Sequence, residues 1–194
     1  MFTYKALILS FAILISILGC SSKSIEEPKM EKITPHARLF SLEDFISVGF
    51  KKNKTYKVDE LPKATSAYFG FIRFNEPASD GKGKKVVEYE LRFYSSHMEA
   101  VEYGFDYAEE RVGPDAKLKK THNPRWKEGL RYARLCIGDQ FNTWKNSADC
   151  ARPKFNEFYI YGNAIILCEG RRLEVAKKNC NSISYKLELL TETN

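Results

Sequence analysis

Apolar and charged residues alternate most clearly over residues 86–94, where every second position is apolar. The apolar members are Val87, Tyr89, Leu91 and Phe93. Because successive side chains of a strand point to opposite faces, this period of two predicts a half-buried β-strand with its charged residues in solvent. Aromatic and branched residues over 65–74 predict a second strand, and the Asn-, Gly- and Lys-rich residues 75–85 predict the turn of a hairpin.

Three segments have the spacing of helices instead. Ser41-Leu42-Glu43-Asp44 has the form of a capping box, which predicts a short helix over roughly 42–50. Ser96 is placed to cap a helix that continues to about Val112, and a third helix is expected over about 171–183. In these last two helices, apolar residues three and four apart form a predicted buried stripe. In the helix after Ser96 the stripe is Met98, Val101, Phe105, Ala108 and Val112, and in the helix over 171–183 it is Leu173, Ala176, Cys180 and Ile183.

The C-terminal half supplies further strands. One is expected over 130–137, and two more, over 157–161 and 164–168, should form a hairpin joined by Gly162-Asn163, a pair suited to a tight turn. The uninterrupted apolar residues 165–167 predict a central strand covered on both sides. Strands, helix, strands and helix in this order predict an α+β domain with an antiparallel sheet of about five strands and its two main helices largely on one face.

The first twenty residues have neither pattern. A short head with Lys5 precedes an apolar run over 6–18 that only two serines interrupt. As a helix this run would span about 20 Å, too little for a hydrocarbon core of about 30 Å. A signal peptide is therefore the better interpretation than a permanent membrane helix.

The residues Ile17-Leu18-Gly19-Cys20 resemble the lipobox of bacterial lipoproteins. The resemblance implies that the leader is removed before Cys20, that Cys20 carries a diacylglycerol thioether, and that the new amino terminus is acylated, for example with palmitate. Two or three chains on one residue anchor a protein firmly to a membrane. Ser21 follows the cysteine, which by the family's sorting pattern implies the outer membrane in a cell that has two. The competing interpretation is an ordinary cleaved leader that happens to end at a cysteine.

This interpretation divides the chain into three parts. Residues 1–19 are the expected signal peptide, and residues 20–35, polar and poor in apolar side chains, are the expected lipidated cysteine and flexible tether. Residues 36–190 are expected to form a single extracytoplasmic domain, which is not assigned to a family. Since Lys5 is the leader's only charged side chain, 30 basic and 25 acidic residues remain, a net charge of +5 that favours anionic neighbours.

Four cysteines remain after Cys20, namely Cys136, Cys150, Cys168 and Cys180. An even number in an exported domain predicts two disulfides, whereas a metal site made of all four would normally use closely spaced C-x-x-C pairs. If the last helix begins near residue 171, Cys180 lies about 13 Å along it, so a bond to Cys168 is not expected. Cys136–Cys180 with Cys150–Cys168 is slightly preferred over the exchanged pairing.

The sequence contains no recognisable catalytic constellation. His36, His97 and His122 are far apart along the chain, and none has a second ligand or a carboxylate at a recognisable spacing. Nucleophile-elbow, zincin and P-loop motifs are absent from the sequence. No catalytic residue, metal ligand or cofactor is therefore predicted.

A basic segment over 117–134 is the best candidate for a binding surface. Its possible contacts to an anionic surface are Lys117, Lys119, Lys120, Arg125, Trp126 and Lys127. Basic residues around an aromatic one suit anionic lipid headgroups or cell-wall polymer, although such a segment is more often only a solvated surface. Nucleic acid is not an expected partner outside the membrane.

Two hypotheses about function follow. The first is a non-catalytic binding or accessory lipoprotein that recruits a solute, an envelope polymer or an envelope protein. The second is a small envelope hydrolase whose site is assembled from distant residues, such as Glu169 with Arg171 and one histidine. The first is preferred because the anchor, the cysteines and the basic segment all fit it.

Overall fold

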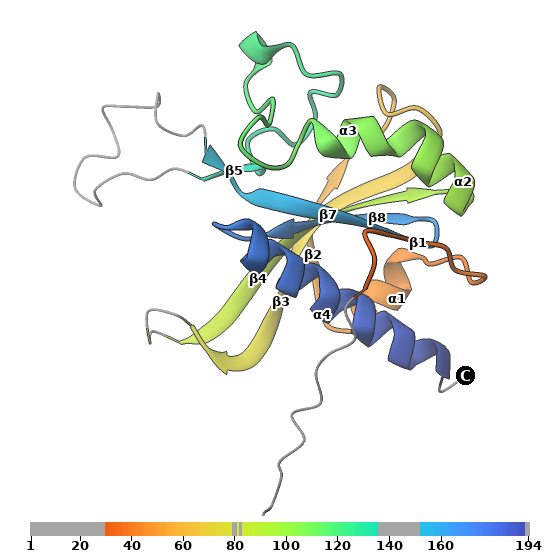
Figure 1. Ribbon diagram of the computed structural model, residues 1–194, viewed down its shortest axis with the longest axis vertical. Helices are drawn as coiled ribbons and strands as arrows, with labels where there is room; N and C mark the ends of the chain where they lie inside the picture. Colours follow the sequence, from red (N-terminus) through yellow and green to blue (C-terminus); the bar gives the residue numbers. More distant parts are fainter. Residues whose placement is uncertain (1–29, 79–80, 82, 136–151, 193–194) are drawn as a thin grey trace, which may run out of the picture.

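The computed structural model describes residues 30–78, 81, 83–135 and 152–192. Six strands form one sheet in the order β1-β7-β8-β4-β3-β2, seen nearly edge-on in Figure 1. Their bounds are β1 Ile33–Thr34, β2 Phe50–Tyr56, β3 Ala64–Pro77, β4 Lys84–Tyr94, β7 Phe155–Tyr161 and β8 Ala164–Glu169. Neighbours pair antiparallel except β1 and β7, which are parallel. The predicted α+β class and antiparallel sheet are confirmed, with six strands instead of about five.

Both predicted hairpins are present. β3 and β4 pair over most of their length, with the turn confined to residues 78–83. β7 and β8 are joined by Gly162-Asn163, where Gly162 has the positive φ of 56° that the turn requires. The Asn163 side chain fixes this turn, since its amide bonds the backbone of Phe40 and the carbonyl of Tyr94. Of the predicted strand over 130–137, the structure describes residues 130–135, and within these Arg134–Leu135 (β5) pairs with Arg152–Pro153 (β6) while residues 130–133 do not form a strand.

Two strands of the six-stranded sheet were not predicted, for different reasons. β2 contains five consecutive exposed residues between Phe50 and Tyr56, so it shows no alternation. Its lysines instead protect a sheet edge. β1 lies within the predicted tether, where Ile33 pairs with Ile160 of β7. The predicted start of the domain at residue 36 is therefore too late.

The two main helical regions lie on opposite faces of the sheet, so the expectation of one face is wrong (Figure 1). Cys180, Ile183 and Leu187 of α4 (Leu173–Glu192) pack with one buried cluster, and Ala100 and Ala108 belong to the other. These faces are called the α4 face and the α3 face. β8 serves both, as its uninterrupted apolar residues predicted: Ile166 and Cys168 lie on the α4 face, and Ile165 and Leu167 on the α3 face.

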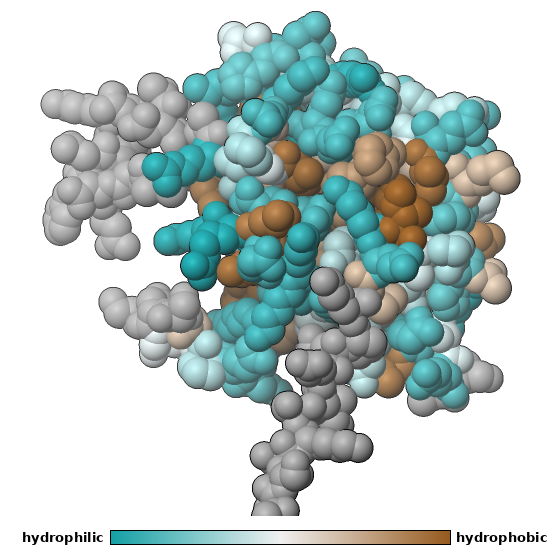
Figure 2. All heavy atoms as spheres, in the orientation of Figure 1, coloured by the Kyte–Doolittle hydropathy of each residue, from teal (hydrophilic) through white to brown (hydrophobic). Residues whose placement is uncertain are grey.

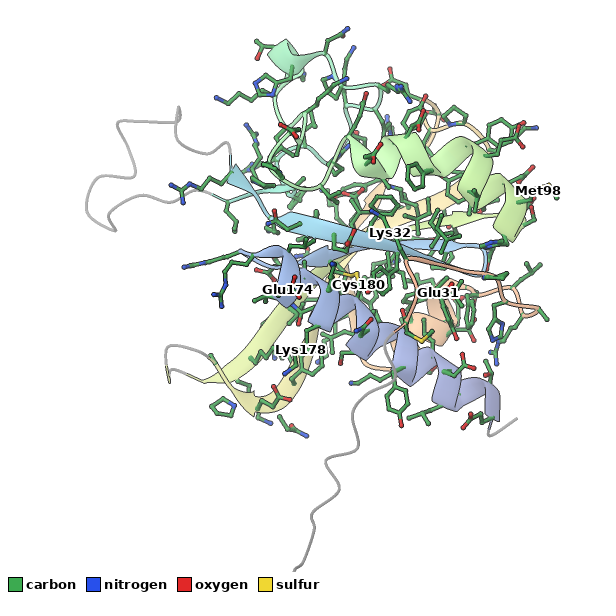
Figure 3. The ribbon with its side chains drawn as sticks, viewed as in Figure 1. Glu31, Lys32, Met98, Glu174, Lys178 and Cys180 are labelled. Atoms are coloured by element: carbon green, nitrogen blue, oxygen red, sulfur yellow. A yellow bond between two sulfur atoms is a disulfide. The ribbon has the colours of Figure 1, made fainter. Side chains whose placement is uncertain are left out.

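The helical region after β4 begins as expected and then departs from a regular helix. The Ser96 hydroxyl accepts the Glu99 amide at its start, so the predicted cap is confirmed. The region consists of α2 (His97–Glu99), a π-helical segment (Ala100–Gly104) and α3 (Phe105–Glu109). Its buried residues are Ala100, Gly104 and Ala108, so only Ala108 of the predicted stripe is fully buried. Val101, Phe105 and Val112 are half-buried, and Met98 is 73% exposed at the outer edge of the molecule (Figure 3).

Gly104 explains this shift of the buried stripe. A Cβ there would lie 2.4 Å from Ile165 of β8 and 2.6 Å from the Tyr94 hydroxyl. The helical backbone therefore approaches the sheet at a position that only glycine can occupy. Small residues rather than large apolar ones then form the contact face, which an apolar pattern does not predict.

The other two helices agree better with the sequence. α1 (Leu42–Ser47) has the predicted capping box between Ser41 and Asp44. α4 buries Ala176, Cys180 and Ile183 as predicted, but Leu173 is 46% exposed and the helix continues to Glu192. No helix in the described part of the chain is long and apolar enough to cross a membrane.

A disulfide joins Cys168 of β8 to Cys180 of α4, which overturns both pairings considered from the sequence. The chain turns sharply at Gly170, where a Cβ would lie 2.4 Å from the Ala176 nitrogen. α4 therefore runs back over the sheet, and the two Cα atoms are 5.5 Å apart. Because α4 runs back over β8, the residues of α4 that precede Cys180 place Cys180 above Cys168. Figure 3 shows Cys180 on the side of α4 that faces the sheet. Cys136 and Cys150 lie outside the described residues.

A peptide map under non-reducing conditions is expected to recover a Cys168–Cys180 peptide and, by elimination, a Cys136–Cys150 peptide. The antiparallel pairing of β5 with β6 supports the second bond, because it brings residues 135 and 152 opposite each other. Replacing both Cys168 and Cys180 by serine should lower the free energy of unfolding by about 2–4 kcal/mol. A peptide that links Cys136 to either Cys168 or Cys180 would contradict this assignment.

Candidate functional site

Charged side chains of β4 are buried on the α3 face, against the sequence prediction. Glu90 and Arg92 belong to the charged set that alternates with apolar residues, yet both are 0% exposed. The expected solvent side of the strand is covered by the α2–α3 region and by residues 113–133. Covering charged groups in this way is costly unless they are paired.

Glu90 and Arg92 pair with each other. Glu90 Oε1 accepts hydrogen bonds from Arg92 Nε at 2.9 Å and from Nη2 at 2.6 Å. A second guanidinium reaches the same carboxylate, since Arg111 Nη1 lies 3.6 Å from Glu90 Oε2. One buried carboxylate therefore holds two buried cations.

Trp126 closes this cluster on its outer side. The guanidinium carbons of Arg92 and Arg111 lie 4.9 Å and 5.1 Å from its ring centroid, within the range of a cation–π interaction. The Tyr56 ring meets it edge-on at 5.8 Å. The indole nitrogen donates to the Lys57 carbonyl at 3.2 Å. Trp126 is 2% exposed, so it lies almost wholly inside this cluster, and the anionic contact predicted for it stays a prediction.

Arg111 connects the buried cluster to the segment outside it. Its Nη2 donates to the carbonyls of Trp126 and Glu128 at 3.1 Å and 3.0 Å, and Nη1 also donates to Glu128. These two carbonyls flank Lys127, whose position is therefore set by the core. Burial lowers the pKa of Arg111 from its ordinary value, while the Glu90 carboxylate opposes that shift.

Two tyrosines complete the cluster in their neutral form. Burial raises the pKa of Tyr94 to about 12 and raises that of Tyr56 well above its ordinary value. Among the described side chains, the Tyr56 and Tyr94 hydroxyls, Glu90 Oε2 and Arg92 Nη1 are buried without a hydrogen-bond partner. Polar atoms left in this way make the cluster sensitive to the loss of any one of its ion pairs.

Two adjoining pockets open in the surface around Lys120 and Lys127, which line both of them. The first, called the basic pocket, has a volume of about 370 Å³. Its cations are Lys119, Lys120, Lys127, Arg131 and Arg134, above an apolar wall of Leu118, Leu130 and Tyr132. No acidic side chain of the described residues lines it.

The second, called the mixed pocket, has a volume of about 390 Å³ and is lined by residues of both charges and by Trp126. Its members are Lys57, Asp59, Glu60, Lys120, Trp126, Lys127 and Glu128. Together the two pockets are called the groove. Figure 2 shows that the upper part of the molecule, where residues 113–133 lie in Figure 1, is largely hydrophilic.

Of the six predicted anionic-surface contacts, some line the groove and others pair with acidic side chains of the protein itself. Lys119, Lys120 and Lys127 line the groove. Lys117 instead donates to Glu110 at 2.7 Å, and Arg125 pairs with Asp106 at 2.7 Å and with Glu110 at 3.3 Å. Sequence reasoning left Arg131 and Arg134 out of the contacts it named, although both belong to the same basic segment.

Glu110 fastens the other end of this segment to α3. It also accepts the backbone amide of Arg125 at 3.0 Å. Partial burial would raise its pKa, but the Arg125 amide and Lys117 outweigh burial, so the pKa of Glu110 is lowered. Glu110 and Arg111 are adjacent in sequence. Glu110 thus binds the segment at its outer side, through Lys117 and Arg125, and Arg111 binds it from the core.

The residues of the hydrolase hypothesis are only partly brought together, because Arg171 interacts with Glu169 but neither His36 nor His97 lies near them. His36 and His97 both lie at the Gly162 turn: His36 packs on Phe40 and Tyr161, and His97 Nδ1 lies 2.7 Å from the Gly162 carbonyl. Glu169 is at the far end of β8, roughly 20 Å away at about 3.3 Å per residue.

Glu169 has close neighbours of its own on the α3 face. It accepts the Glu88 amide at 2.7 Å, and Lys154 pairs with the Glu88 carboxylate. Burial and the Glu88 charge raise its pKa, while Lys154 and Arg171 oppose the rise. No group of three or more His, Cys, Asp or Glu side chains in the described part could hold a metal ion.

A family of unknown function (DUF6810) has a model that matches residues 41–189. The chain belongs to this family. The matched region of the DUF6810 member contains α1 through most of α4, the buried cluster and the groove, and it excludes Cys20. Neither a curated protein nor a solved structure matches the chain significantly.

Replacing Glu90 by Gln is expected to lower the free energy of unfolding by about 3–5 kcal/mol, because two buried guanidiniums lose their shared counter-charge. The matched control is Glu109→Gln, which removes the same charge from an exposed position of α3. Urea unfolding of the two variants would measure the difference. Equal midpoints would mean that the Glu90 pairs contribute nothing to stability.

Proposed function

We propose that this protein is an exported lipoprotein, anchored by lipid on Cys20, whose domain binds an anionic polymer of the cell envelope in the groove without catalysis. The basic pocket is the observation that carries the proposal. It gathers five cations over an apolar wall with no carboxylate among its described lining residues. A pocket of this kind attracts phosphate or carboxylate groups and excludes cationic ones.

The surroundings of the basic pocket favour binding over general solvation. The seven cations of residues 117–134 would repel one another. Asp106 and Glu110 neutralise two of them, Lys117 and Arg125. Among the described residues, no acidic side chain forms an ion pair with Lys120, Lys127, Arg131 or Arg134 of the pocket, so these four keep their charge available to a ligand. The backbone on either side of Lys127 is held by Arg111, a residue with 2% exposure. A preformed pocket loses less entropy on binding than a loop that must first be ordered.

The position of the groove favours a polymer over the headgroups of the anchoring membrane. Met30, ten residues after Cys20, packs against the α4 face. Leu118 and Trp126, which line the groove, belong to the α3 face on the other side of the sheet. Figure 1 shows α4 below the sheet and residues 113–133 above it. A domain anchored from its α4 side thus presents the groove away from its own bilayer.

The anchor is tested by Cys20→Ser. We expect this variant to lose incorporation of labelled palmitate and to leave the detergent phase on phase separation, because the thiol is the atom that would carry the diacylglycerol. Ser21→Ala is the matched control and should remain lipidated. Unchanged labelling of Cys20→Ser would disprove the lipobox assignment.

Binding is tested with two charge-reversed variants of equal net charge. Lys120→Glu with Lys127→Glu should weaken binding of a soluble polyphosphate roughly tenfold at low salt, equivalent to about 1.4 kcal/mol. Lys51→Glu with Lys54→Glu, on the exposed edge strand β2, is the control and should bind nearly as the parent does. If both double variants lost the same affinity for polyphosphate, the loss would be explained by net charge alone. That result would contradict a binding site in the groove.

A vesicle arm of the same experiment distinguishes the membrane from the polymer. Vesicles rich in anionic lipid and soluble polyphosphate are compared at the same ionic strength. Binding to vesicles alone, lost in the Lys120/Lys127 variant, would place the ligand in a membrane and overturn the polymer.

A further inference from the structure

We propose that the ligand is zwitterionic: an anionic group occupies the basic pocket while an amine attached to it lies against the carboxylates of the mixed pocket. This inference rests on the proposed function, because it names the chemistry of the ligand for the same groove. It is drawn from the carboxylates of the mixed pocket, with which a purely anionic ligand would form no favourable contact.

The mixed pocket contains three carboxylates within a strongly basic surface. Asp59, Glu60 and Glu128 line it together with Lys57, Lys120 and Lys127. In the portion of the chain that the structure describes, no ion pair joins any of these three carboxylates to a cation. A purely anionic ligand would be repelled by them, so they serve no purpose for an anion.

The acids of α3 provide an internal comparison. Asp106 and Glu110 lie beside the same basic segment and do pair with it, through Arg125 and Lys117 at 2.7 Å. These two carboxylates are therefore neutralised by the segment. Asp59 and Glu60 are exposed and line the same pocket as three lysines, yet form no pair with them. Charges of both signs face the pocket and remain available to a ligand.

The two walls of the mixed pocket are held in place from below. Trp126 donates to the carbonyl of Lys57 on one wall, and Arg111 holds the carbonyl of Glu128 on the other. The backbone at Lys57 and at Glu128 is thereby positioned by the buried cluster rather than by their own charges. A ligand with both charges, spaced like the two pockets, satisfies both walls without rearrangement.

The size of the groove suits this ligand. Each pocket, at about 370 and 390 Å³, is large enough for a small charged group with its carbon linker. Lys120 and Lys127 border both pockets, so an anion bound between them lies next to the carboxylates. An ammonium group a few bonds from a phosphate can therefore reach the mixed pocket.

The test compares phosphoethanolamine with N-acetylphosphoethanolamine, which keeps the phosphate but has no charge on nitrogen. Titration of the unlipidated chain from residue 21, followed by NMR, should give at least fivefold tighter binding of the amine. In Asp59→Asn with Glu60→Gln this preference should disappear. Asp115→Asn with Glu109→Gln, which removes the same charge from exposed positions outside the groove, should retain it.

The outcomes separate this inference from the proposed function. Equal binding of both compounds by the parent chain, with loss of both in Lys120→Glu/Lys127→Glu, would overturn the zwitterion and leave the anion site. If Asp59→Asn/Glu60→Gln still preferred phosphoethanolamine, the preference would arise from the size of the acetyl group and not from the carboxylates. That result would also overturn the inference. Binding of neither compound nor polyphosphate would overturn both proposals.

Discussion

The pairing of Glu90 with two buried arginines is the interaction on which the α3 face depends. A carboxylate in the middle of a central strand would oppose burial, and so would each guanidinium alone. Together they allow residues 113–133 to close over the sheet, with Trp126 stacked against both cations. The same arginine that completes the pair then fixes the backbone on either side of Lys127. The groove at the surface is thus a consequence of charge satisfied in the core.

The two faces of the sheet are stabilised by different physics. On the α4 face the apolar set of β4 packs against α4, and the Cys168–Cys180 bond ties that helix to β8. On the α3 face, polar and charged side chains share the interior with aromatic rings. The apolar face resembles a plain structural core. The polar face is more demanding, because its buried ions tolerate little change, and it is the face that forms the groove.

The separation of these faces also gives the proposed anchoring a direction. Met30 meets the α4 face, and the groove belongs to the other side of the sheet. A lipid on Cys20 and a ligand in the groove would then not compete for the same surface. Membrane attachment and recognition would be independent, and the tether would set only how far the groove stands from the bilayer.

Features encoded by neighbouring residues were determined by the sequence itself. The lipobox-like leader, the Ser41 capping box, the Ser96 cap, both hairpins and the buried positions Ala176, Cys180 and Ile183 all follow from spacing within one segment. Features that depend on what covers a residue were decided only by the tertiary structure. The alternation in β4 showed that Glu90 and Arg92 share a face, but not that Arg111 and Trp126, distant in sequence, close over it.

The cysteines show the same division. Their number predicted disulfides, while the partner of Cys180 depended on α4 folding back at Gly170 over β8. Spacing along a helix measures distance within that helix and not the distance to a strand beneath it. The resemblance of residues 17–20 to a lipobox is therefore readable from the sequence, and the anchor that it implies is a proposal. The groove exists only because the fold assembles Lys57, Lys120, Lys127 and their acidic neighbours in one place.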